Sequence, residues 1–256
     1  MVYELVHAAL DDHIATVTVD RPPVNAFTRQ MYEEVAAVFA ELAAQAGVWV
    51  IILSGAGDKA FCAGNDINEF LIRDAAAIES HIALMKRFQR TLYGCPVPLI
   101  GAINGHALGL GTALADACDV LVAVPQATFG FPEIRVGAFG GATKLRRLVP
   151  EHKARWLALT GGRISAEELH RLGSIERLVP PGELMTTARE LAKEIIGVPP
   201  LGIRAVKKAL NETEYLPLWD AVDREQAHAQ ELRATEDSAE AARAFLEKRP
   251  ARFKGR

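Results

Sequence analysis

The 256-residue sequence contains few cysteines, and none of them form a C-x-x-C pair. There are three, Cys62, Cys95 and Cys118, and this odd number with wide spacing fits neither a disulfide framework nor a zinc site. An isolated cysteine most often behaves as a small buried hydrophobe. We therefore expect buried free thiols and a reducing, cytoplasmic location.

Long hydrophobic runs are also missing. The longest apolar run covers residues 48–53, far short of the roughly 18 residues of a membrane-spanning helix. The N-terminal segment carries acidic residues where a signal peptide has basic ones, and it has no apolar core. These absences argue against a membrane protein and against a secreted one.

Positive charge is not in excess. Lys and Arg together number 29 and Asp and Glu 32, which gives a net charge of −3. Proteins that bind nucleic acid through bulk electrostatic attraction carry a positive surplus. We therefore expect no nucleic-acid partner, and we interpret the basic cluster KLRR at residues 144–147 as the solvated face of a helix.

Several catalytic signatures are absent as well. The sequence contains no P-loop, no HExxH pair and no GxSxG turn. Gly109 and Gly111 follow a strand pattern, but Leu114 occupies the place of the third glycine in a dinucleotide-binding fingerprint. The sequence thus indicates neither a metal nor a redox cofactor.

The first 130 residues do contain an alternation of strand and helix patterns. Runs typical of strands lie at residues 14–19, 48–53, 99–103 and 120–124, and helical patterns lie at 31–46 and 75–93. The run at 48–53 is apolar throughout, as expected for a strand buried on both faces. The alternation predicts an α/β fold with crossovers on a largely parallel sheet.

Beyond about residue 140 the patterns are mostly helical. SAEE at residues 165–168 is a capping box that predicts a helix start, and DSAE at 237–240 suggests another before residues 241–246. Proline pairs at 180–181 and 199–200 interrupt the region. We place a boundary at the second pair, between a β/α core at 1–198 and a helical C-terminal subdomain at 199–256.

Two loops combine small residues with a following helix. They are FCAGNDI at residues 61–67 and GHALGLGT at 105–112. Small residues leave backbone N–H groups accessible, and a helix N-terminus adds positive potential. If the loops converge, they can form an oxyanion hole; otherwise they are tight turns chosen for packing. Composition leaves both interpretations open.

These two loops, with ALADACD at 113–119 and FGFPEIRVG at 129–137, resemble motifs of the enoyl-CoA hydratase/isomerase (crotonase) family in the same order. RPPVNAF at 21–27 and the terminal EKRPARFKGR match the ends of such proteins, so the resemblance covers essentially the whole chain. It implies a crotonase-like ββα superhelix with a helical C-terminal trimerisation region. It also implies an acyl-CoA substrate, no cofactor besides the coenzyme A of that substrate, and a homo-trimer or a dimer of trimers.

The resemblance assigns the oxyanion hole to the backbone N–H groups of Asn65 and Leu110, which would hold the thioester oxygen. One such donor lowers a barrier by roughly 3–4 kcal/mol. The family usually has Ala or Ser at position 65, so the Asn65 side chain would add a polar contact in the acyl pocket. Further contacts with coenzyme A or the acyl group are implied for these residues: Ala63, Gly64, Asp66, Ile67, Gly109, Phe253 and Lys254.

The acid/base residues depart from the hydratase pattern. Hydratases of the family carry two glutamates; the second corresponds to Glu133, whereas Ala113 replaces the first. A positioned acid/base contributes roughly 10²–10⁴-fold, and a single glutamate is typical of the family's Δ3-Δ2-enoyl-CoA isomerases. Asp116 lies one turn beyond Ala113, and we interpret it as a surface or salt-bridged aspartate.

Two polar residues of the loops receive structural interpretations. Asp66 is expected to cap the helix after the first loop, and His106 to pack or form a local hydrogen bond. The oligomer is expected to form through residues after about 200, with Trp219 and Val222 in its apolar contact.

The resulting hypothesis is an enzyme that stabilises a thioester enolate, with Glu133 as proton shuttle. The reaction is either hydration of an enoyl-CoA or a Δ3-Δ2 double-bond shift. The alternatives are an acyl-CoA decarboxylase or C–C lyase of the same family, and a non-catalytic acyl-CoA-binding protein.

Overall fold

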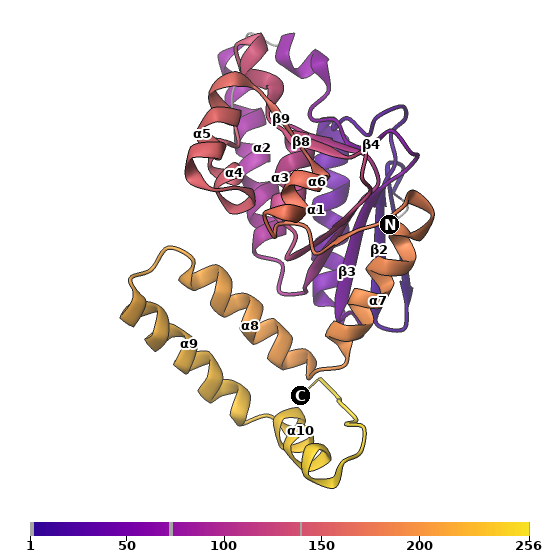
Figure 1. The fold of residues 1–256 in the computed structure, drawn as a ribbon, viewed down its shortest axis with the longest axis vertical. Helices are drawn as coiled ribbons and strands as arrows, with labels where there is room; N and C mark the ends of the chain where they lie inside the picture. Colours follow the sequence, from indigo (N-terminus) through magenta and orange to yellow (C-terminus); the bar gives the residue numbers. More distant parts are fainter. Residues whose placement is uncertain (1–2, 72–73, 139, 256) are drawn as a thin grey trace.

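The computed structural model describes residues 3–71, 74–138 and 140–255 (Figure 1). The described residues form two sheets. In the larger sheet all neighbours are parallel except the first pair, and its order is β1 (Val6–Asp11), β2 (Ile14–Val19), β3 (Val50–Gly55), β5 (Leu99–Ile103), β7 (Val120–Ala123) and β10 (Arg177–Leu178). The smaller sheet has the order β4 (Ala60–Cys62), β6 (His106–Leu108), β8 (Thr128–Gly130) and β9 (Arg163–Ser165).

The chain visits the two sheets in turn, which generates a superhelix. β3 is followed by β4, β5 by β6 and β7 by β8, so each turn gives one strand to each sheet. Because β4, β6 and β8 pair in parallel, the loops that leave them emerge at the same edge. The predicted α/β class and ββα superhelix are confirmed.

Helices cover the sheets and connect the turns. α7 packs on β3, β5 and β7, and α1 packs on α2. The described α-helices are α1 (Arg29–Ala44), α2 (Ala75–Tyr93), α3 (Leu110–Asp116), α4 (Ala142–Leu148), α5 (Glu151–Thr160), α6 (Ala166–Arg171), α7 (Leu184–Ile196), α8 (Pro200–Thr213), α9 (Leu218–Arg233) and α10 (Glu236–Glu247). Short 3₁₀ helices are η1 (Ile67–Leu71), η2 (Pro132–Val136) and η3 (Pro181–Glu183).

Local sequence signals explain several element boundaries. The Asp74 side chain accepts a hydrogen bond from the Ala77 N–H at 2.8 Å, so α2 begins at the predicted residue. Ser165 caps α6 and accepts from the Glu168 N–H at 3.1 Å, as the capping box predicted. The strand predicted at 48–53 is β3, whose first five residues are buried, and the three cysteines are buried free thiols as expected.

Two boundary predictions were wrong. The segment 105–112, expected to be a loop, contains strand β6. α10 begins at Glu236, because Thr235 caps it by accepting from the Ser238 N–H at 3.1 Å. The predicted start after Asp237 failed because the Asp237 carboxylate is bound to distant backbone groups and does not act as a cap.

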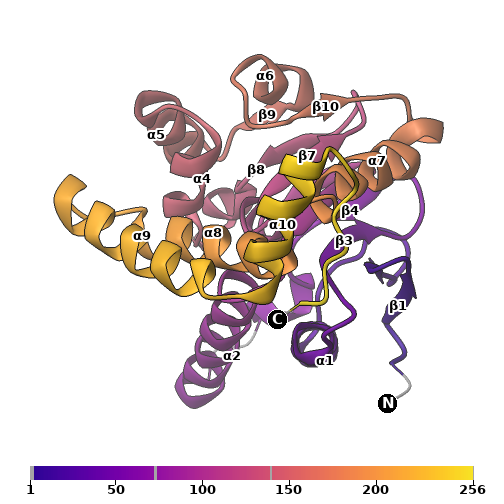
Figure 2. The ribbon, with the colours of Figure 1, turned by 90° about the horizontal axis from the view of Figure 1, so that it is seen from below.

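The last three helices extend away from the sheets. α8 and α9 lie side by side as a helical hairpin, and α10 with the C-terminal tail lies beyond them (Figures 1 and 2). The predicted boundary at residue 198 falls between α7 and α8. Within the described ranges, no helix has both the length and the apolar character needed to cross a membrane.

Candidate active site

A cavity of about 430 Å³ opens where the loops after β4, β6 and β8 meet α2. Apolar side chains of α2 form one wall and Phe131 and Leu110 part of another, with a few polar groups between them. Its lining residues are Asn65, Ala77, Ile78, His81, Ile82, Met85, Gln89, Gly109, Leu110, Ala113, Phe131, Glu133, Gly137, Ala138, Gly140 and Gly141. A mostly apolar cavity with few convergent polar groups is typical of a small-molecule site.

Asn65 is held in the cavity wall by its backbone neighbours. The Phe27 N–H donates to the Gly64 carbonyl at 2.9 Å, and the Asp66 N–H donates to the Phe27 carbonyl at 2.9 Å. These bonds fix the backbone on both sides of Asn65. Asn25, which is buried, donates from Nδ2 to the Ala60 carbonyl at 2.9 Å and so holds the strand that leads into this loop.

The second loop is fixed from β8 and from α3. The Gly109 N–H donates to the Gly130 carbonyl at 2.8 Å, and the buried Thr112 hydroxyl donates to the Ala107 carbonyl at 2.7 Å. A Cβ at Gly111 would lie 2.0 Å from the Cys62 carbonyl oxygen. The absence of a side chain at 111 therefore lets the N-terminus of α3 touch the strand that precedes Asn65.

The backbone N–H groups of Asn65 and Leu110 have no hydrogen-bond acceptor among the described residues. Leu110 is the first residue of α3, so its N–H is one of the donors that a helix leaves unpaired. Both residues line the cavity. The two loops thus converge, and together they can bind an oxygen atom that carries negative charge.

Glu133 contributes the carboxylate of the site. It lies in η2, and its Oε1 sits so close to the second loop that a Cβ at Gly109 would lie 1.7 Å from it. Gly109 has φ +55°, and glycine tolerates both this angle and this contact. Burial raises the pKa of Glu133 above its ordinary value, and its Oε2 is buried without a hydrogen-bond partner in the described structure. Such a carboxyl is suited to exchanging a proton with a bound molecule.

Ala113 lines the cavity, whereas Asp116 does not. The prediction of a surface position for Asp116 was wrong, because its side chain is fully buried. It accepts a short hydrogen bond from the Tyr93 hydroxyl and lies 3.9 Å from Arg147 Nε, which agrees with the predicted ion pair. Burial raises the pKa of Asp116 to about 7. Glu133 is therefore the one carboxylate among the described residues that line the cavity.

The cluster at residues 144–147 is only partly solvated, contrary to the prediction. Lys144 Nζ lies 4.1 Å from the centroid of the Tyr93 ring, and burial lowers the pKa of this lysine. Arg147 lies 3.3 Å from Glu214 as well as near Asp116. The helix face is turned toward charged and aromatic partners that sequence spacing does not show.

The other loop residues lie around the cavity. Asp66 pairs with Arg21 at 2.5 Å and accepts from the Asn68 N–H at 3.0 Å; the latter bond and Arg21 lower its pKa. This agrees with the expected cap. His106 Nδ1 lies 3.0 Å from the Thr128 hydroxyl, as expected of a local hydrogen bond. Of the predicted acyl-CoA contacts in the loops, Gly109 lines the cavity, and Ala63, Gly64, Asp66 and Ile67 do not.

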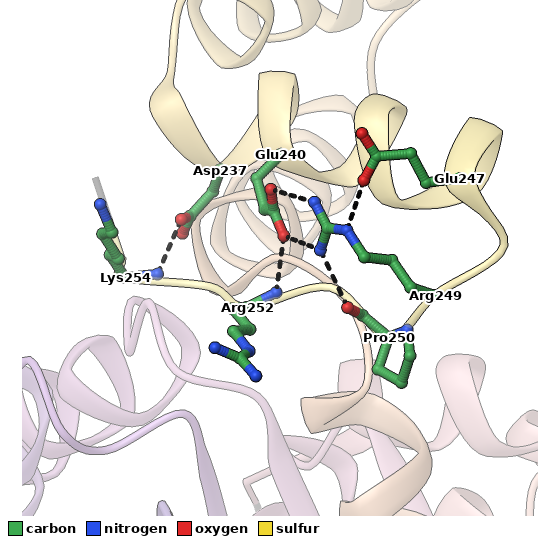
Figure 3. A network of polar contacts seen from close by, with 7 residues as sticks. All are labelled: Asp237, Glu240, Glu247, Arg249, Pro250, Arg252 and Lys254. Carbon is green, nitrogen blue, oxygen red and sulfur yellow. Dashed lines mark hydrogen bonds and ion pairs between the residues drawn. The ribbon is translucent and has the colours of Figure 1, made fainter.

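The predicted contacts of the C-terminal tail lie elsewhere. The N–H groups of Lys254 and Gly255 donate to the two oxygens of Asp237, each at 2.7 Å. Arg249 bonds to Glu240 and Glu247, and the Arg252 N–H donates to Glu240 at 3.0 Å (Figure 3). Neither Phe253 nor Lys254 lines the cavity of its own chain.

The polar groups that α2 adds to the cavity lining, and that α1 places behind Asn65, were not predicted. The Tyr32 hydroxyl donates to Asn65 Oδ1 at 2.6 Å, and the His81 ring lies edge-on to Tyr32 with centroids 6.0 Å apart. His81 and Gln89 both line the cavity. A polar residue on each of two amphipathic helices was the available signal, but sequence does not show which helix faces meet. Within the described ranges, no group of three or more His, Cys, Asp or Glu side chains could hold a metal ion.

Comparison with known proteins agrees with this geometry. The family model described as "Enoyl-CoA hydratase/isomerase" matches residues 10–256. The chain is 36% identical over 240 residues to the short-chain-enoyl-CoA hydratase of Clostridium acetobutylicum, with 92% of each chain covered. It is 33% identical over 257 residues to the crotonyl-CoA hydratase of Syntrophomonas wolfei, with 99% of each covered.

A solved structure is similar over the whole chain. The crystal structure of an enoyl-CoA hydratase from Bacillus anthracis has a TM-score of 0.94 and 31% identity, and the match covers 99% of this chain and 100% of that one. The motifs, the fold and these similarities agree, and the chain belongs to the enoyl-CoA hydratase/isomerase (crotonase) family.

Proposed function

We propose that this enzyme adds water to the double bond of a 2-enoyl-CoA, and removes it in reverse, with Glu133 as the only group that carries a proton. One observation supports this most strongly. A single cavity is lined by Glu133 and by Asn65 and Leu110, whose backbone N–H groups have no acceptor among the described residues. His81 and Ala113 line the same cavity. Water added to a double bond needs both a proton carrier and polar neighbours.

The N–H groups of Asn65 and Leu110 bind the thioester oxygen in this mechanism. When an oxygen nucleophile adds to C3, the π electrons of the C2–C3 bond move toward the carbonyl, and negative charge builds on the thioester oxygen. Donors fixed in advance stabilise that charge, and the loss of one costs roughly 10²–10³-fold in rate. The backbone bonds that fix both loops provide this rigidity.

Glu133 moves one proton between two atoms. As a carboxylate it takes a proton from water while the water oxygen bonds to C3. The protonated Glu133 then gives that proton to C2 as the enolate collapses, so the net change is addition of H and OH. Burial raises the pKa of Glu133 and so favours the protonated form after the first step.

A Δ3-Δ2 double-bond shift is the second candidate, and the presence of a single carboxylate favours it. Glu133 would remove a proton from C2 of a 3-enoyl-CoA and return it to C4, through the same enolate. No water is needed, so Ala113 is not a deficiency in this reaction. The two reactions share the oxyanion hole and differ only in what occupies the space beside Ala113.

Product analysis separates the candidates. Purified protein is given crotonyl-CoA and, separately, 3-hexenoyl-CoA. Hydration predicts 3-hydroxybutyryl-CoA from the first, with loss of enoyl absorbance. Formation of 2-hexenoyl-CoA without hydration of crotonyl-CoA would support the shift instead. Turnover of neither thioester would favour a decarboxylase, a C–C lyase or a non-catalytic acyl-CoA-binding protein.

We also propose that the active enzyme is a trimer or a dimer of trimers formed through α8–α10. Large apolar side chains of these helices are exposed in the single chain, including Leu210, Leu218 and Trp219, the last at 75%. Val222, on the same helix as Trp219, is half-buried. A partner copy would cover this surface and bring its tail residues Phe253 and Lys254 near a neighbouring site. A monomeric mass in native mass spectrometry would contradict the assembly.

A further inference from the structure

The side chain of Asn65 is held in one orientation by a buried tyrosine. Its Oδ1 accepts the hydrogen bond from the Tyr32 hydroxyl at 2.6 Å. The Tyr32 ring is fully buried and packs edge-on against Phe27 and Phe88, with centroids 5.3 and 4.8 Å away. A ring packed on two sides cannot swing away, so the hydroxyl restrains the Asn65 amide.

The bond to Tyr32 occupies the amide oxygen of Asn65 and leaves its amide nitrogen available to donate to a ligand. Among the described residues, Asn65 Nδ2 has no hydrogen-bond partner, and Asn65 lines the cavity together with Ala113 and Glu133. A bound acyl group excludes water from such a cavity. An amide N–H that loses water without gaining an acceptor costs free energy, so the site favours a ligand that offers an oxygen there.

The short asparagine side chain limits where along the acyl chain the ligand oxygen can lie. In the proposed function, the backbone N–H of Asn65 holds the thioester oxygen, so the amide of the same residue lies only a few bonds along the acyl chain. We propose that Asn65 Nδ2 binds an oxygen on C3 of the acyl group, and that Tyr32 is the positioning residue for this contact. This inference rests on the proposed function and names the acyl class it takes: 3-hydroxyacyl and 3-oxoacyl thioesters.

This contact replaces part of what a carboxylate at position 113 would do. In hydration, the C3 oxygen is the oxygen of the attacking water, and Asn65 holds it while Glu133 takes its proton. An amide N–H donates a hydrogen bond but gives up no proton at neutral pH, so Glu133 remains the only proton carrier. The water oxygen bonds to C3, and its proton passes through Glu133 to C2.

A binding experiment isolates the contact from the chemistry. In protein carrying Glu133→Gln, which stops proton transfer, the Kd of 3-hydroxybutyryl-CoA and of butyryl-CoA is measured by isothermal titration calorimetry. The two ligands differ only by the C3 oxygen. Adding Asn65→Ala should raise the Kd of 3-hydroxybutyryl-CoA roughly 3- to 10-fold, the scale of one hydrogen bond, and leave that of butyryl-CoA unchanged. Alanine keeps the backbone N–H, so the oxyanion hole stays intact.

Tyr32→Phe tests the positioning role separately. It keeps the ring packing and removes the hydroxyl, and should lose part of the preference, roughly 2- to 5-fold, again only for the C3-oxygenated ligand. Asn68→Ala removes an amide of η1, directly after the loop of Asn65, that does not line the cavity, and should leave the ratio unchanged.

Three outcomes overturn the inference. An unchanged ratio of the two Kd values in Asn65→Ala would show that the amide does not contact the C3 oxygen. An equal weakening of both ligands would indicate disturbance of the loop instead of a lost contact. Failure of both thioesters to bind the Glu133→Gln protein would overturn the proposed function, and the inference with it.

Discussion

Glu133 and Glu240 show how differently the same side chain behaves in two regions of this molecule. Glu133 lies in the cavity, where burial raises its pKa and leaves Oε2 without a partner in the described structure. Glu240 lies on α10, where it accepts hydrogen bonds from Arg249 at 2.6 and 3.0 Å and from the Arg252 N–H at 3.0 Å. These bonds lower its pKa to about 2.

The two environments assign the two carboxylates different tasks. A raised pKa favours the protonated form, so Glu133 can hold and release a proton during a reaction. A lowered pKa keeps Glu240 charged, so its contacts with the tail are present above the ordinary glutamate pKa and are lost only as the pH falls toward 2. Residue type alone would not separate a proton carrier from a tether.

The largest expected effect comes from removing the proton carrier. Glu133→Gln keeps the size and the hydrogen-bonding capacity but cannot carry a proton, so kcat should fall by roughly 10²-fold or more. Glu167→Gln changes an exposed glutamate of α6 and is the matched control for the loss of one charge. Steady-state kinetics with crotonyl-CoA measure both. Retention of most turnover in Glu133→Gln would mean that another group carries the proton.

A second carboxylate in the cavity would give Glu133 a charged neighbour, as Glu240 has in the tail. Ala113→Glu places a carboxyl beside Glu133, and the two repel, so one pKa rises and the pH optimum should move upward. Hydration relative to the double-bond shift should increase by up to roughly 10²-fold, the lower end of what a positioned acid/base contributes. Ala113→Gln is the matched control of equal size. A pH profile unchanged by Ala113→Glu would mean that the two side chains do not share a site.

Asp116 is buried outside the cavity, so its effect on the free energy of unfolding shows what burial of a carboxyl costs where no substrate binds. Its pKa is raised to about 7, so between about pH 4 and pH 7 the folded chain binds a proton that the unfolded chain has released. The free energy of unfolding should therefore fall as the pH rises through this window, by at most about 1.4 kcal/mol per pH unit. Asp116→Asn should flatten this dependence in urea titrations at pH 5, 6, 7 and 8. Parallel curves for wild type and variant would exclude the carboxylate as the source.

The smallest expected effect lies in the tail. Deleting residues 253–256 should raise KM for the acyl-CoA by roughly 2- to 10-fold, the scale of one or two hydrogen bonds, and leave kcat unchanged. Glu240→Gln weakens the tether without shortening the chain and should have the same effect to a lesser degree. A fall in kcat at constant KM would instead connect the tail to catalysis or folding.

Sequence patterns predicted the elements whose signals are local. The helix predicted at 75–93 is α2, and the apolar run at 48–53 predicted β3 to within two residues at each end. The start of α10 was not, because Asp237 binds N–H groups 17 and 18 residues away. The buried position of Asp116 likewise depends on Tyr93 and Arg147, which belong to other helices.

The candidate site was predictable in part, and the resemblance to the family was needed for it. Composition left open whether the two loops converge; the structure brings Asn65, Leu110 and Glu133 to one cavity. Tyr32 and His81 were missed because the sequence does not distinguish them from other polar residues on their helices. Only the packing of α1 against α2 brings them beside Asn65.

The contact between Gly109 and Glu133 has a consequence for engineering. The carboxylate occupies the space that any side chain at 109 would need, so the two positions cannot be varied independently. Even Gly109→Ala would displace the carboxylate while the neighbouring Leu110 N–H stayed in place. Position 113, whose methyl group borders open cavity, has no such restriction. New chemistry on this scaffold is therefore best sought by varying residue 113 with residue 109 left as glycine.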